Sequence, residues 1–287
     1  MSTAPTPQPI VPEDRDAVLA FIAAQQADPA TACAYVGMRE EGLETDLDEL
    51  DQPWTRTVRV LRDAGGAVTG AALVEWEEEM VGRAWVYGPW TTPETWDRDA
   101  PALLAAVVEQ APVGRHQVFA ALANTRLAAL AEAEGWTPDS VTIQFAADRA
   151  ALARPDPAVR PAAPDDLPAL TALHAAAFPD TYATARQLLD LDSEYTVLVL
   201  FDDAGGGLAG YVAGRPDESD AYLDFVAVAP EGRRTGAGSR LVRAFADALP
   251  GDRVRLTCDS TQTAAVALHE RLGFERVGQT RAWDRRS

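Results

Sequence analysis

The sequence predicts a mixed α+β fold that is built twice in tandem. Its 287 residues are about twice the length of a typical domain of roughly 150 residues. The two halves also repeat features at a nearly constant spacing. Asp-Ala-Gly-Gly begins at Asp63 and at Asp203, an offset of 203 − 63 = 140, and a glycine before an aromatic residue stands at Gly135 and Gly273, an offset of 273 − 135 = 138. Duplication explains both offsets, and chance recurrence of common turn signals is the alternative.

Each repeated feature predicts an element in both halves. In each half a proline and two acidic residues stand before a stretch with helical apolar periodicity. This pattern predicts a helix start, because acidic residues satisfy the free amides there. Each Asp/Gly turn joins two short apolar runs as a hairpin, and each Gly-aromatic pair suits a helix C-cap followed by a strand. The predicted helices span 17–25 and 167–177, and the predicted strands span 58–61, 71–76, 197–201 and 208–213.

The segment from 148 to 164 separates the halves. It carries four prolines among alanine and arginine, a composition that disfavours regular structure and stiffens a connection. We therefore expect one domain over 1–150, a proline-rich linker over 151–160 and a second domain over 161–287.

Composition restricts the function classes. The chain is 47% hydrophobic and 24% charged, which is ordinary for globular proteins. No apolar run approaches the roughly 20 residues of a membrane span, and the opening residues lack a leader pattern, so we expect a cytoplasmic protein. The net charge of −19 disfavours nucleic acid and anionic membranes as partners. Two cysteines predict no disulfide framework and no metal site. Oligomeric state cannot be predicted.

The segment from 221 to 249 carries the strongest chemical signal. A strand is expected at 222–228, a glycine-bearing loop at 232–238 and an apolar-periodic helix at 239–249. Free amides at a helix start and glycines without side chains form a cradle for an anion such as a diphosphate. Arginines add positive charge. The residues expected in this cradle are Arg233, Arg234, Thr235, Gly236, Ala237, Gly238 and Ser239, with further charge from Arg240 and Arg243.

The C-terminal half, roughly 158–287, resembles the GCN5-related N-acetyltransferases. The resemblance rests on Val226-Ala227-Val228-Ala229-Pro230, on Arg233-x-x-Gly236-x-Gly238, on Ala265-x-x-Leu268-His269 and on Leu272-Gly273-Phe274, in that order. It implies a mainly antiparallel sheet flanked by helices, with the repeat extending the same fold to the first half. The tandem layout is similar to that of mycothiol synthase.

The resemblance also implies an acetyl-CoA site. The diphosphate would lie on the cradle, and the pantetheine arm would lie along the strand at Val226, Ala227 and Val228, with a backbone N–H near Val228 as oxyanion donor. Gln262 stands where the family commonly has asparagine, and it could still reach the cofactor arm.

The acid and the base of such a transfer remain open. His269 stands where the family usually has the tyrosine that protonates the thiolate, and it is either that acid or an ordinary surface histidine. Asp220, Tyr222 and Asp224 alternate along one strand, so one face would carry all three. Each is a candidate base or simple polar decoration. Cys258 suggests an acyl-cysteine route only weakly, because a lone strand cysteine is usually a small buried hydrophobe.

The N-terminal half departs from the family pattern. The offset places Trp96 and Arg98 where the cradle glycines would be, so we expect a degenerate domain without a cofactor. Asn124 matches the family asparagine but is expected to be a helix cap. Acidic residues at 75–79 and 40–51 could draw a cationic amine or form a solvated face. The tryptophans of this half are expected in the core, with one or two available to line an acceptor pocket.

The sequence therefore predicts an acetyl-CoA-dependent N-acetyltransferase with its site in the second domain. The expected acceptor is a primary amine of a small molecule, or else a peptide amine. A non-catalytic acyl-CoA sensor and a scaffold without cofactor are the alternatives.

Overall fold

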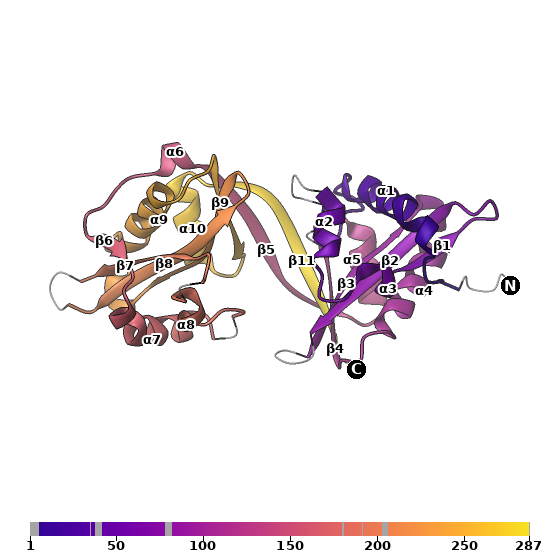
Figure 1. Ribbon diagram of the computed structural model, residues 1–287, viewed down its shortest axis with the longest axis horizontal. Helices are drawn as coiled ribbons and strands as arrows, with labels where there is room; N and C mark the ends of the chain where they lie inside the picture. The colour runs from indigo at the N-terminus through magenta and orange to yellow at the C-terminus, as the bar shows by residue number, and fades with distance from the viewer. Residues whose placement is uncertain are drawn as a thin grey trace. The chain divides into compact units, whose positions relative to one another are not determined.

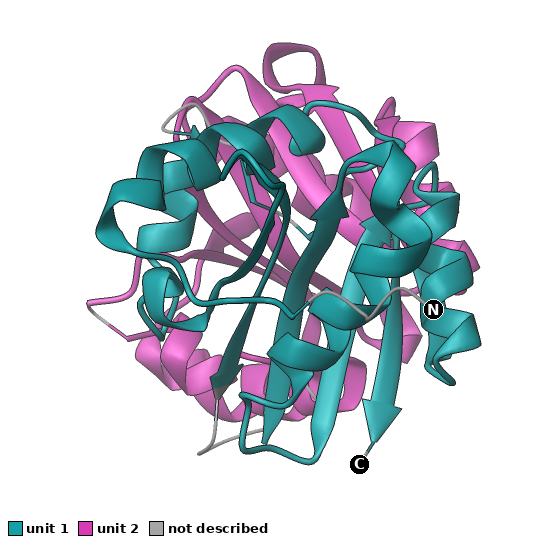
Figure 2. Cartoon of the chain, turned by 90° about the vertical axis from the view of Figure 1, so that its right-hand side faces the viewer, with its two compact units in different colours: residues 1–141, 279–287 teal, residues 142–278 magenta. Residues whose placement is uncertain are grey.

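The computed structural model describes residues 6–34, 36–37, 42–77, 82–179, 181–190, 192–202 and 206–286 (Figure 1). The chain forms two compact units: unit 1 is Met1–Val141 with Gln279–Ser287, and unit 2 is Thr142–Gly278 (Figure 2). Unit 2 thus begins at Thr142, before the linker expected at 151–160, and residues 279–287, which were expected in the second domain, belong to unit 1. The described residues include no helix that is long and apolar enough to cross a membrane.

Unit 1 is a sheet with helices packed on it. Its strand order is β1-β2-β3-β4-β11, with antiparallel pairing except between β3 and β4, which are parallel. The strands are β1 Arg59–Arg62, β2 Val68–Glu77, β3 Arg83–Thr91, β4 Arg115–Ala121 and the end of β11 Glu275–Arg286. The helices are α1 Arg15–Gln26, α2 Gly42–Asp48, α3 Trp54–Thr57, α4 Trp96–Val108 and α5 Thr125–Ala133, with short turns η1 Pro12–Asp14 and η2 Pro93–Thr95.

Unit 2 repeats this plan. Its strand order is β5-β10-β9-β8-β7-β6, and β9 and β10 are its parallel pair. The strands are the end of β5 Thr137–Asp148, then β6 Val159–Pro161, β7 Thr196–Phe201, β8 Leu208–Asp217, β9 Asp220–Val228 and β10 Arg253–Asp259. The helices are α6 Arg149–Leu152, α7 Leu167–Ala177, α8 Ala185–Leu188, α9 Ala237–Ala248 and α10 Thr263–Leu272, with turns η3 Pro164–Asp166 and η4 Pro230–Gly232. The predicted tandem α+β fold is confirmed.

Helices cover both faces of the unit 2 sheet. In Figure 1, α7 and α8 lie on one face and α9 and α10 on the other. The two faces carry separate apolar clusters: Leu241 and Phe245 of α9 pack in one, and Leu170 of α7 packs in the other. The sheet is therefore buried on both sides, which explains the near-continuous apolar run of β7.

The last strand of each unit comes from the other half of the sequence. Residues 142–148 of β5 pair antiparallel with β10 in unit 2, with Phe145 opposite Leu256. Residues 280–286 of β11 pair antiparallel with β4 in unit 1, with Trp283 opposite Val118. Phe145 and Trp283 are each 1% exposed and belong to the cores of unit 2 and unit 1 respectively. The two halves thus exchange equivalent strand segments.

The proline-rich segment contains more regular structure than its composition predicts. It carries α6 and the three-residue strand β6, and it lies within unit 2. Pro161 is tolerated because β6 is the edge strand of the sheet, where a missing N–H leaves no ladder bond unmade. The predicted turn at 63–66 joins β1 to β2, whereas residues 203–205 of its repeat lie outside the described residues.

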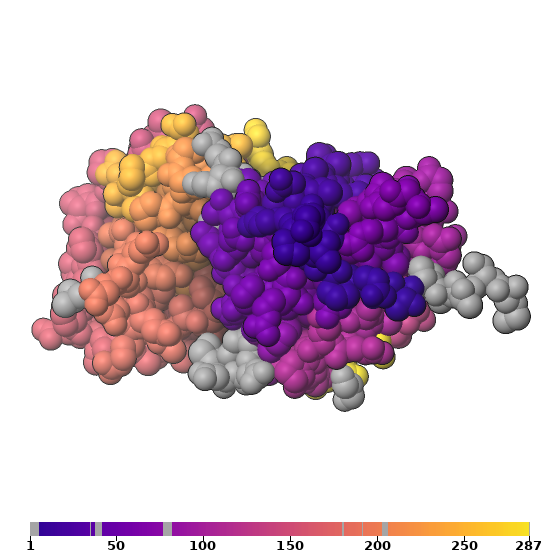
Figure 3. Space-filling view, turned by 45° about the vertical axis from the view of Figure 1, so that its right-hand side comes forward, coloured from indigo at the N-terminus to yellow at the C-terminus, as the bar shows by residue number. Residues whose placement is uncertain are grey.

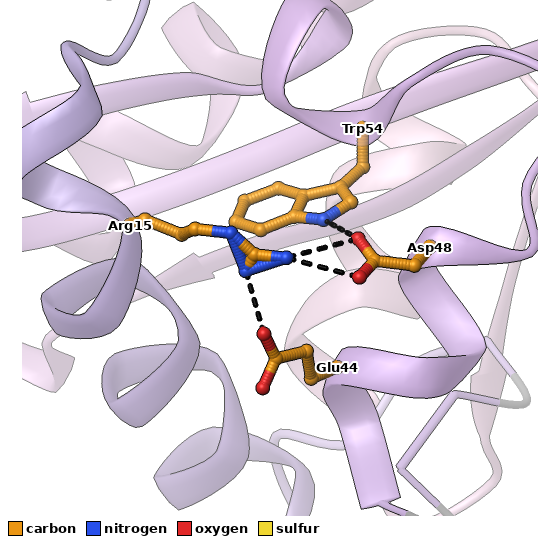
Figure 4. A network of polar contacts seen from close by, with 4 residues as sticks. All are labelled: Arg15, Glu44, Asp48 and Trp54. Carbon is orange, nitrogen blue, oxygen red and sulfur yellow. Dashed lines mark hydrogen bonds and ion pairs between the residues drawn. The ribbon is translucent and has the colours of Figure 1, made fainter.

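Polar contacts tie the helices of unit 1 together (Figure 4). The Arg15 guanidinium of α1 bonds Glu44 at 2.7 Å and Asp48 at 3.0 Å on α2, and its carbon lies 5.3 Å from the Trp54 ring centroid. The Trp54 indole N–H donates to Asp48 at 2.8 Å. The N-terminal residues, indigo in Figure 3, form part of the unit 1 surface.

Candidate active site

The two parallel strands of unit 2 separate soon after they begin. β9 and β10 pair only at Ala221 with Val254 and at Tyr222 with Arg255, although β9 continues to Val228. Ala229 donates its N–H to Ala209 on β8 at 2.9 Å. Because successive strand amides point to opposite edges, the N–H of Val228 is directed to the edge that β10 has left. The strand therefore offers backbone groups to a ligand.

The open edge of β9 leads directly to the N-terminus of α9. Gly236 at the N-cap has φ 92°, a left-handed conformation that favours glycine, and no side chain of the described structure caps the helix. The first turn of α9 contains no acidic residue. Its free amides and positive dipole end are therefore without a side-chain cap or a repelling charge in the first turn, a geometry suited to an anion.

Gly238 has a different role from Gly236. A Cβ at position 238 would lie 3.1 Å from a Leu268 methyl carbon on α10 and 3.6 Å from a Val228 methyl carbon on β9. A Cβ at position 236 would meet nothing within 4 Å. Gly238 thus permits close packing between α9, α10 and β9, and a large side chain there would disturb that packing before it filled the cradle.

The other expected cofactor residues lie around this path. Val226 and Val228 pack toward the α9 face, whereas Ala227 is buried on the α7 face. Arg233, Arg234 and Thr235 are exposed on the loop, and Gln262 is exposed at the start of α10 without capping it. Thr235 donates its hydroxyl to the Gly232 carbonyl at 2.7 Å. Ala237 is buried and Ser239 is half-buried at the start of α9.

Arg240 differs from the sequence expectation. Its guanidinium is held by Asp156 through hydrogen bonds of 2.6 and 3.1 Å. Its charge is therefore already balanced within the fold, and the exposed Arg233 and Arg234 are the cations of the loop.

Asp224 occupies a bulge in β9. Leu223 and Phe225 are opposite consecutive residues of β8, which leaves Asp224 as the extra residue. Leu223 packs in the cluster beneath α9, whereas Phe225 packs in the cluster beneath α7. After the bulge, the residues of β9 that would have faced α9 face α7 instead. Bulges often redirect a side chain next to an active site.

The Asp224 carboxylate is buried with few partners. Its side chain is 1% exposed, Arg215 Nε lies 3.7 Å from Oδ2, and Tyr182 donates its hydroxyl to Oδ1. Oδ2 has no hydrogen-bond partner within the described residues. Burial raises the pKa of Asp224, and the hydrogen bond from Tyr182 and the charge of Arg215 offset part of that rise. A carboxyl with a raised pKa is suited to accepting a proton.

The other two acidic or phenolic candidates are engaged elsewhere. Asp220 accepts a hydrogen bond from the Arg253 amide at 3.0 Å and pairs with Arg255 at 2.8 Å. The Tyr222 hydroxyl lies 3.1 Å from the Thr257 hydroxyl. Both link β9 to β10 near the positions where the two strands pair.

His269 lies in the core of unit 2 rather than on its surface. It is 3% exposed, and its ring centroid lies 5.8 Å from that of Phe145 and 5.4 Å from that of Phe274. Burial lowers the pKa of His269 to about 4. The charged form is therefore not populated at neutral pH. Cys258 is buried in the same core, and burial raises its pKa to about 11, as expected of a small buried hydrophobe.

Tyr182 was missed by the sequence analysis. It is 62% exposed, its ring lies 5.3 Å from Phe225, and it stands 42 residues before its partner Asp224. No motif marks this pairing, because it depends on the packing of the loop before α8 against β9. The signal that could have drawn attention is an aromatic residue among small and polar ones.

The equivalent edge in unit 1 is filled by the chain itself. β3 and β4 pair only from Arg83 to Val86, yet the Gly88 N–H is 2.9 Å from the Cys33 sulfur and the Ala34 N–H donates to the Phe119 carbonyl at 2.9 Å. Gly88 is 140 residues before Val228. The amide that is directed to an open edge in unit 2 is thus occupied in unit 1.

The helix that follows in unit 1 also differs from α9. The first turn of α4 carries Asp97 and Asp99. Arg98 pairs with Asp99 at 2.6 Å, so the turn keeps a net negative charge, which disfavours an anion. Asn124 caps α5 by accepting a hydrogen bond from the Leu127 amide at 3.1 Å, which confirms the expected helix cap. Its amide group also donates to the Ala32 carbonyl at 3.2 Å, next to the residues that fill the edge.

Comparison with known proteins supports the fold and the resemblance. Residues 167–274 match the acetyltransferase (GNAT) family. A GCN5-related N-acetyltransferase from Sphaerobacter thermophilus has 20% identity and a TM-score of 0.69, covering 100% of this chain and 96% of that one. A tandem GNAT protein from the clavulanic acid biosynthesis pathway has 18% identity and a TM-score of 0.60, covering 98% and 97%.

A third structure covers less of the chain. A GCN5-related N-acetyltransferase from Kribbella flavida has 18% identity and a TM-score of 0.54, and covers 76% of this chain and 88% of that one. At these identities the structures show the fold alone. No curated protein matches the chain in sequence. The resemblance to a tandem arrangement of this family is confirmed.

Proposed function

Because residues 167–274 match the acetyltransferase (GNAT) family, we propose that the protein is an acetyl-CoA-dependent N-acetyltransferase that acts through unit 2. The acceptor is a primary amine of a small molecule, with a peptide amine as the second class. One observation carries the proposal: the open edge of β9 leads without interruption to the uncapped N-terminus of α9. An extended ligand that ends in a diphosphate fits this path.

The residues along the path fit the cofactor. The amides of residues 234–239 and the exposed guanidinium groups of Arg233 and Arg234 would hold the diphosphate. The backbone at Val226 and Val228 would hold the arm, and Gln262 is exposed at the start of α10, the helix that packs beside α9. When bound, acetyl-CoA supplies the acetyl group as an activated thioester.

Asp224 is the general base of the proposal. An ammonium ion must lose a proton before its nitrogen can attack, and a carboxylate with a raised pKa accepts that proton more readily. Tyr182 donates to Asp224 and is exposed to solvent, so it positions the carboxylate and connects it to the surface. The Val228 N–H donates to the negative charge that develops on the carbonyl oxygen. His269 is neutral at neutral pH, so it can offer the departing thiolate at most a hydrogen bond, and the thiolate takes its proton from the nitrogen that has attacked, which loses it as the amide forms.

Unit 1 takes no part in cofactor binding in this proposal. Cys33 and Ala34 fill the edge that would receive the arm, and the acidic first turn of α4 repels a diphosphate. Calorimetric titration with acetyl-CoA is expected to give one site per chain. Two sites would contradict the degenerate role of unit 1, and no binding would contradict the proposed function.

The test of the base compares Asp224→Asn with Tyr222→Phe. Release of free CoA is measured with a panel of primary amines. We expect Asp224→Asn to lower kcat about 10²-fold or more, with the affinity for acetyl-CoA unchanged. We expect Tyr222→Phe to retain activity, because the Tyr222 hydroxyl lies 3.1 Å from that of Thr257 on β10 and is not the proposed base. Equal kcat in Asp224→Asn and the parent would refute the assignment of the base.

A non-catalytic acyl-CoA sensor is the second candidate. The burial of His269 among Phe145 and Phe274 favours it, because the position that carries the family's acid is here a core position. A sensor would bind acetyl-CoA at one site per chain and release no CoA with any amine of the panel.

A further inference from the structure

Unit 1 contains a cavity that the acetyl transfer does not use. It has a volume of about 310 Å³ and is lined by Val36, Asp46, Glu75, Trp85, Tyr87 and Phe119. These residues come from the loop before α2 and from α2, β2, β3 and β4. All the described residues that line the cavity therefore belong to unit 1.

Two features of the cavity select for a cation. Its apolar wall is aromatic, and aromatic faces attract ammonium and guanidinium groups. The Trp85 ring already shows this property, because the Arg83 guanidinium carbon lies 4.9 Å from its centroid. Arg83 is not one of the lining residues. The polar wall is anionic, formed by the carboxyl groups of Asp46 and Glu75.

Glu75 is the carboxyl group that a ligand would meet. It lies opposite Trp85 on the neighbouring strand, and the Tyr87 hydroxyl donates to its Oε2 at 2.6 Å. Among the ion pairs of the described residues none joins an arginine to Glu75, and the chain has no lysine. Burial raises the pKa of Glu75, hydrogen bonds from Tyr87 and from the Asp51 backbone offset part of that rise, and the nearby charge of Asp51 adds to it. The carboxyl is thus held in place by neutral donors without a countercharge.

From this arrangement we propose that unit 1 binds a small organic cation, a primary ammonium or guanidinium ion, with the charged group at Glu75 and the carbon skeleton against Trp85, Tyr87 and Phe119. Ligand pockets commonly combine apolar walls with a few polar groups that fix orientation. The volume suits a molecule of small size, and the aromatic side chains lose little conformational freedom on binding. This binding is separate from acetyl transfer and does not require acetyl-CoA.

The test is calorimetric titration of the full chain, without acetyl-CoA, with n-butylammonium, agmatine and tetramethylammonium at low salt. The uncharged control ligand is n-butanol. We expect saturable binding of the two hydrogen-bonding cations, about tenfold weaker binding in Glu75→Gln, and none of n-butanol. The matched control variant is Glu132→Gln, which makes the same chemical change at an exposed position of α5 and should bind as the parent does.

Two further variants locate the ligand. Tyr87→Phe removes the hydroxyl that occupies Glu75 but keeps the ring, so binding should be equal to or tighter than that of the parent. Trp85→Leu keeps Glu75 and removes the aromatic face, so cation binding should weaken severalfold. This variant tests the proposal independently if Glu75→Gln does not fold. The proposal is overturned if no cation saturates the protein, if Glu132→Gln weakens binding as much as Glu75→Gln, or if n-butanol binds as tightly as n-butylammonium. None of these outcomes bears on CoA release by unit 2.

Discussion

Trp283 offers the sharpest test of the strand exchange. It stands after the whole of unit 2 in the sequence, yet it is 1% exposed in the core of unit 1 and pairs with Val118 on β4. Trp283→Ala removes the indole and leaves a cavity beside β4. The substitution should therefore weaken unit 1 and spare unit 2.

The expected loss is about 3 kcal/mol. Burying roughly 200 Å² of indole at about 25 cal/mol per Å² is worth about 5 kcal/mol as an upper bound. The indole N–H of Trp283 is buried without a hydrogen-bond partner in the described structure. Removing this unsatisfied donor stabilises the folded state by about 1–3 kcal/mol, which offsets part of the loss. The difference lies at the lower end of the roughly 3–5 kcal/mol measured for such truncations.

Hydrogen exchange followed by mass spectrometry resolves the two units. In Trp283→Ala, peptides of β4, residues 115–121, should exchange faster, while peptides of β10, residues 253–259, should not change. Phe145→Ala is the reciprocal variant and should accelerate exchange in β10 rather than β4, because Phe145 packs in unit 2. Arg285→Ala, an exposed change on the same strand as Trp283, is the control. Faster exchange in β10 of Trp283→Ala, with β4 unchanged, would refute the assignment of β11 to unit 1.

Three further outcomes follow from single groups. His269 has a folded pKa of about 4 against an ordinary value of 6.5. Between these pH values the unfolded chain binds more protons than the folded one, so stability falls as pH falls. Between pH 7 and pH 5 the free energy of unfolding, measured by urea titration, should drop about 2 kcal/mol more in the parent than in His269→Phe. Ser239→Glu places a negative charge in the cradle and should weaken acetyl-CoA binding at least tenfold in calorimetry without loss of helix stability, whereas Thr125→Glu, at the start of α5, should not weaken it. Cys33 and Cys258 are buried with raised pKa values, so a thiol reagent should react with the native chain far more slowly than with the chain in urea; rapid native labelling would contradict their burial.

The cradle could be predicted from sequence because it is local. Gly236, the proline before it and the apolar period after it all lie within a short stretch of chain, and backbone amides provide the chemistry. The duplication was visible for the same reason, since turns and helix starts leave short signatures. The acetyl-CoA assignment then rested on the order of these local motifs.

The base could not be chosen from sequence because its environment is assembled from distant residues. Asp224 owes its environment to the bulge of β9 and to Tyr182, which stands 42 residues earlier in the sequence, whereas Asp220 pairs with Arg255. His269 was uncertain for a similar reason: helical periodicity cannot show that Phe145, 124 residues earlier, would pack against its ring. The alternation of apolar residues along a strand likewise does not show which strand is its neighbour in the sheet. The pairing of β5 with unit 2 and of β11 with unit 1 could therefore not be predicted from the sequence.

The lack of lysine gives the acetyl-transfer assay a clean background. The chain has no side-chain amine, so spontaneous acetylation of lysine by the cofactor cannot consume acetyl groups or add mass to the protein. Acetyl groups that leave the cofactor can be followed directly in the amine that receives them.

The exchanged strands also set an order for folding during synthesis. Domains generally fold as the chain leaves the ribosome, with the N-terminal one first. Here β5 is made before the rest of unit 2, so unit 2 has its full sheet once residue 278 has emerged. Unit 1 waits for residues 280–286, which follow the whole of unit 2 in the sequence. The half of the protein that is synthesised first therefore completes its sheet only after the whole of unit 2 has been synthesised.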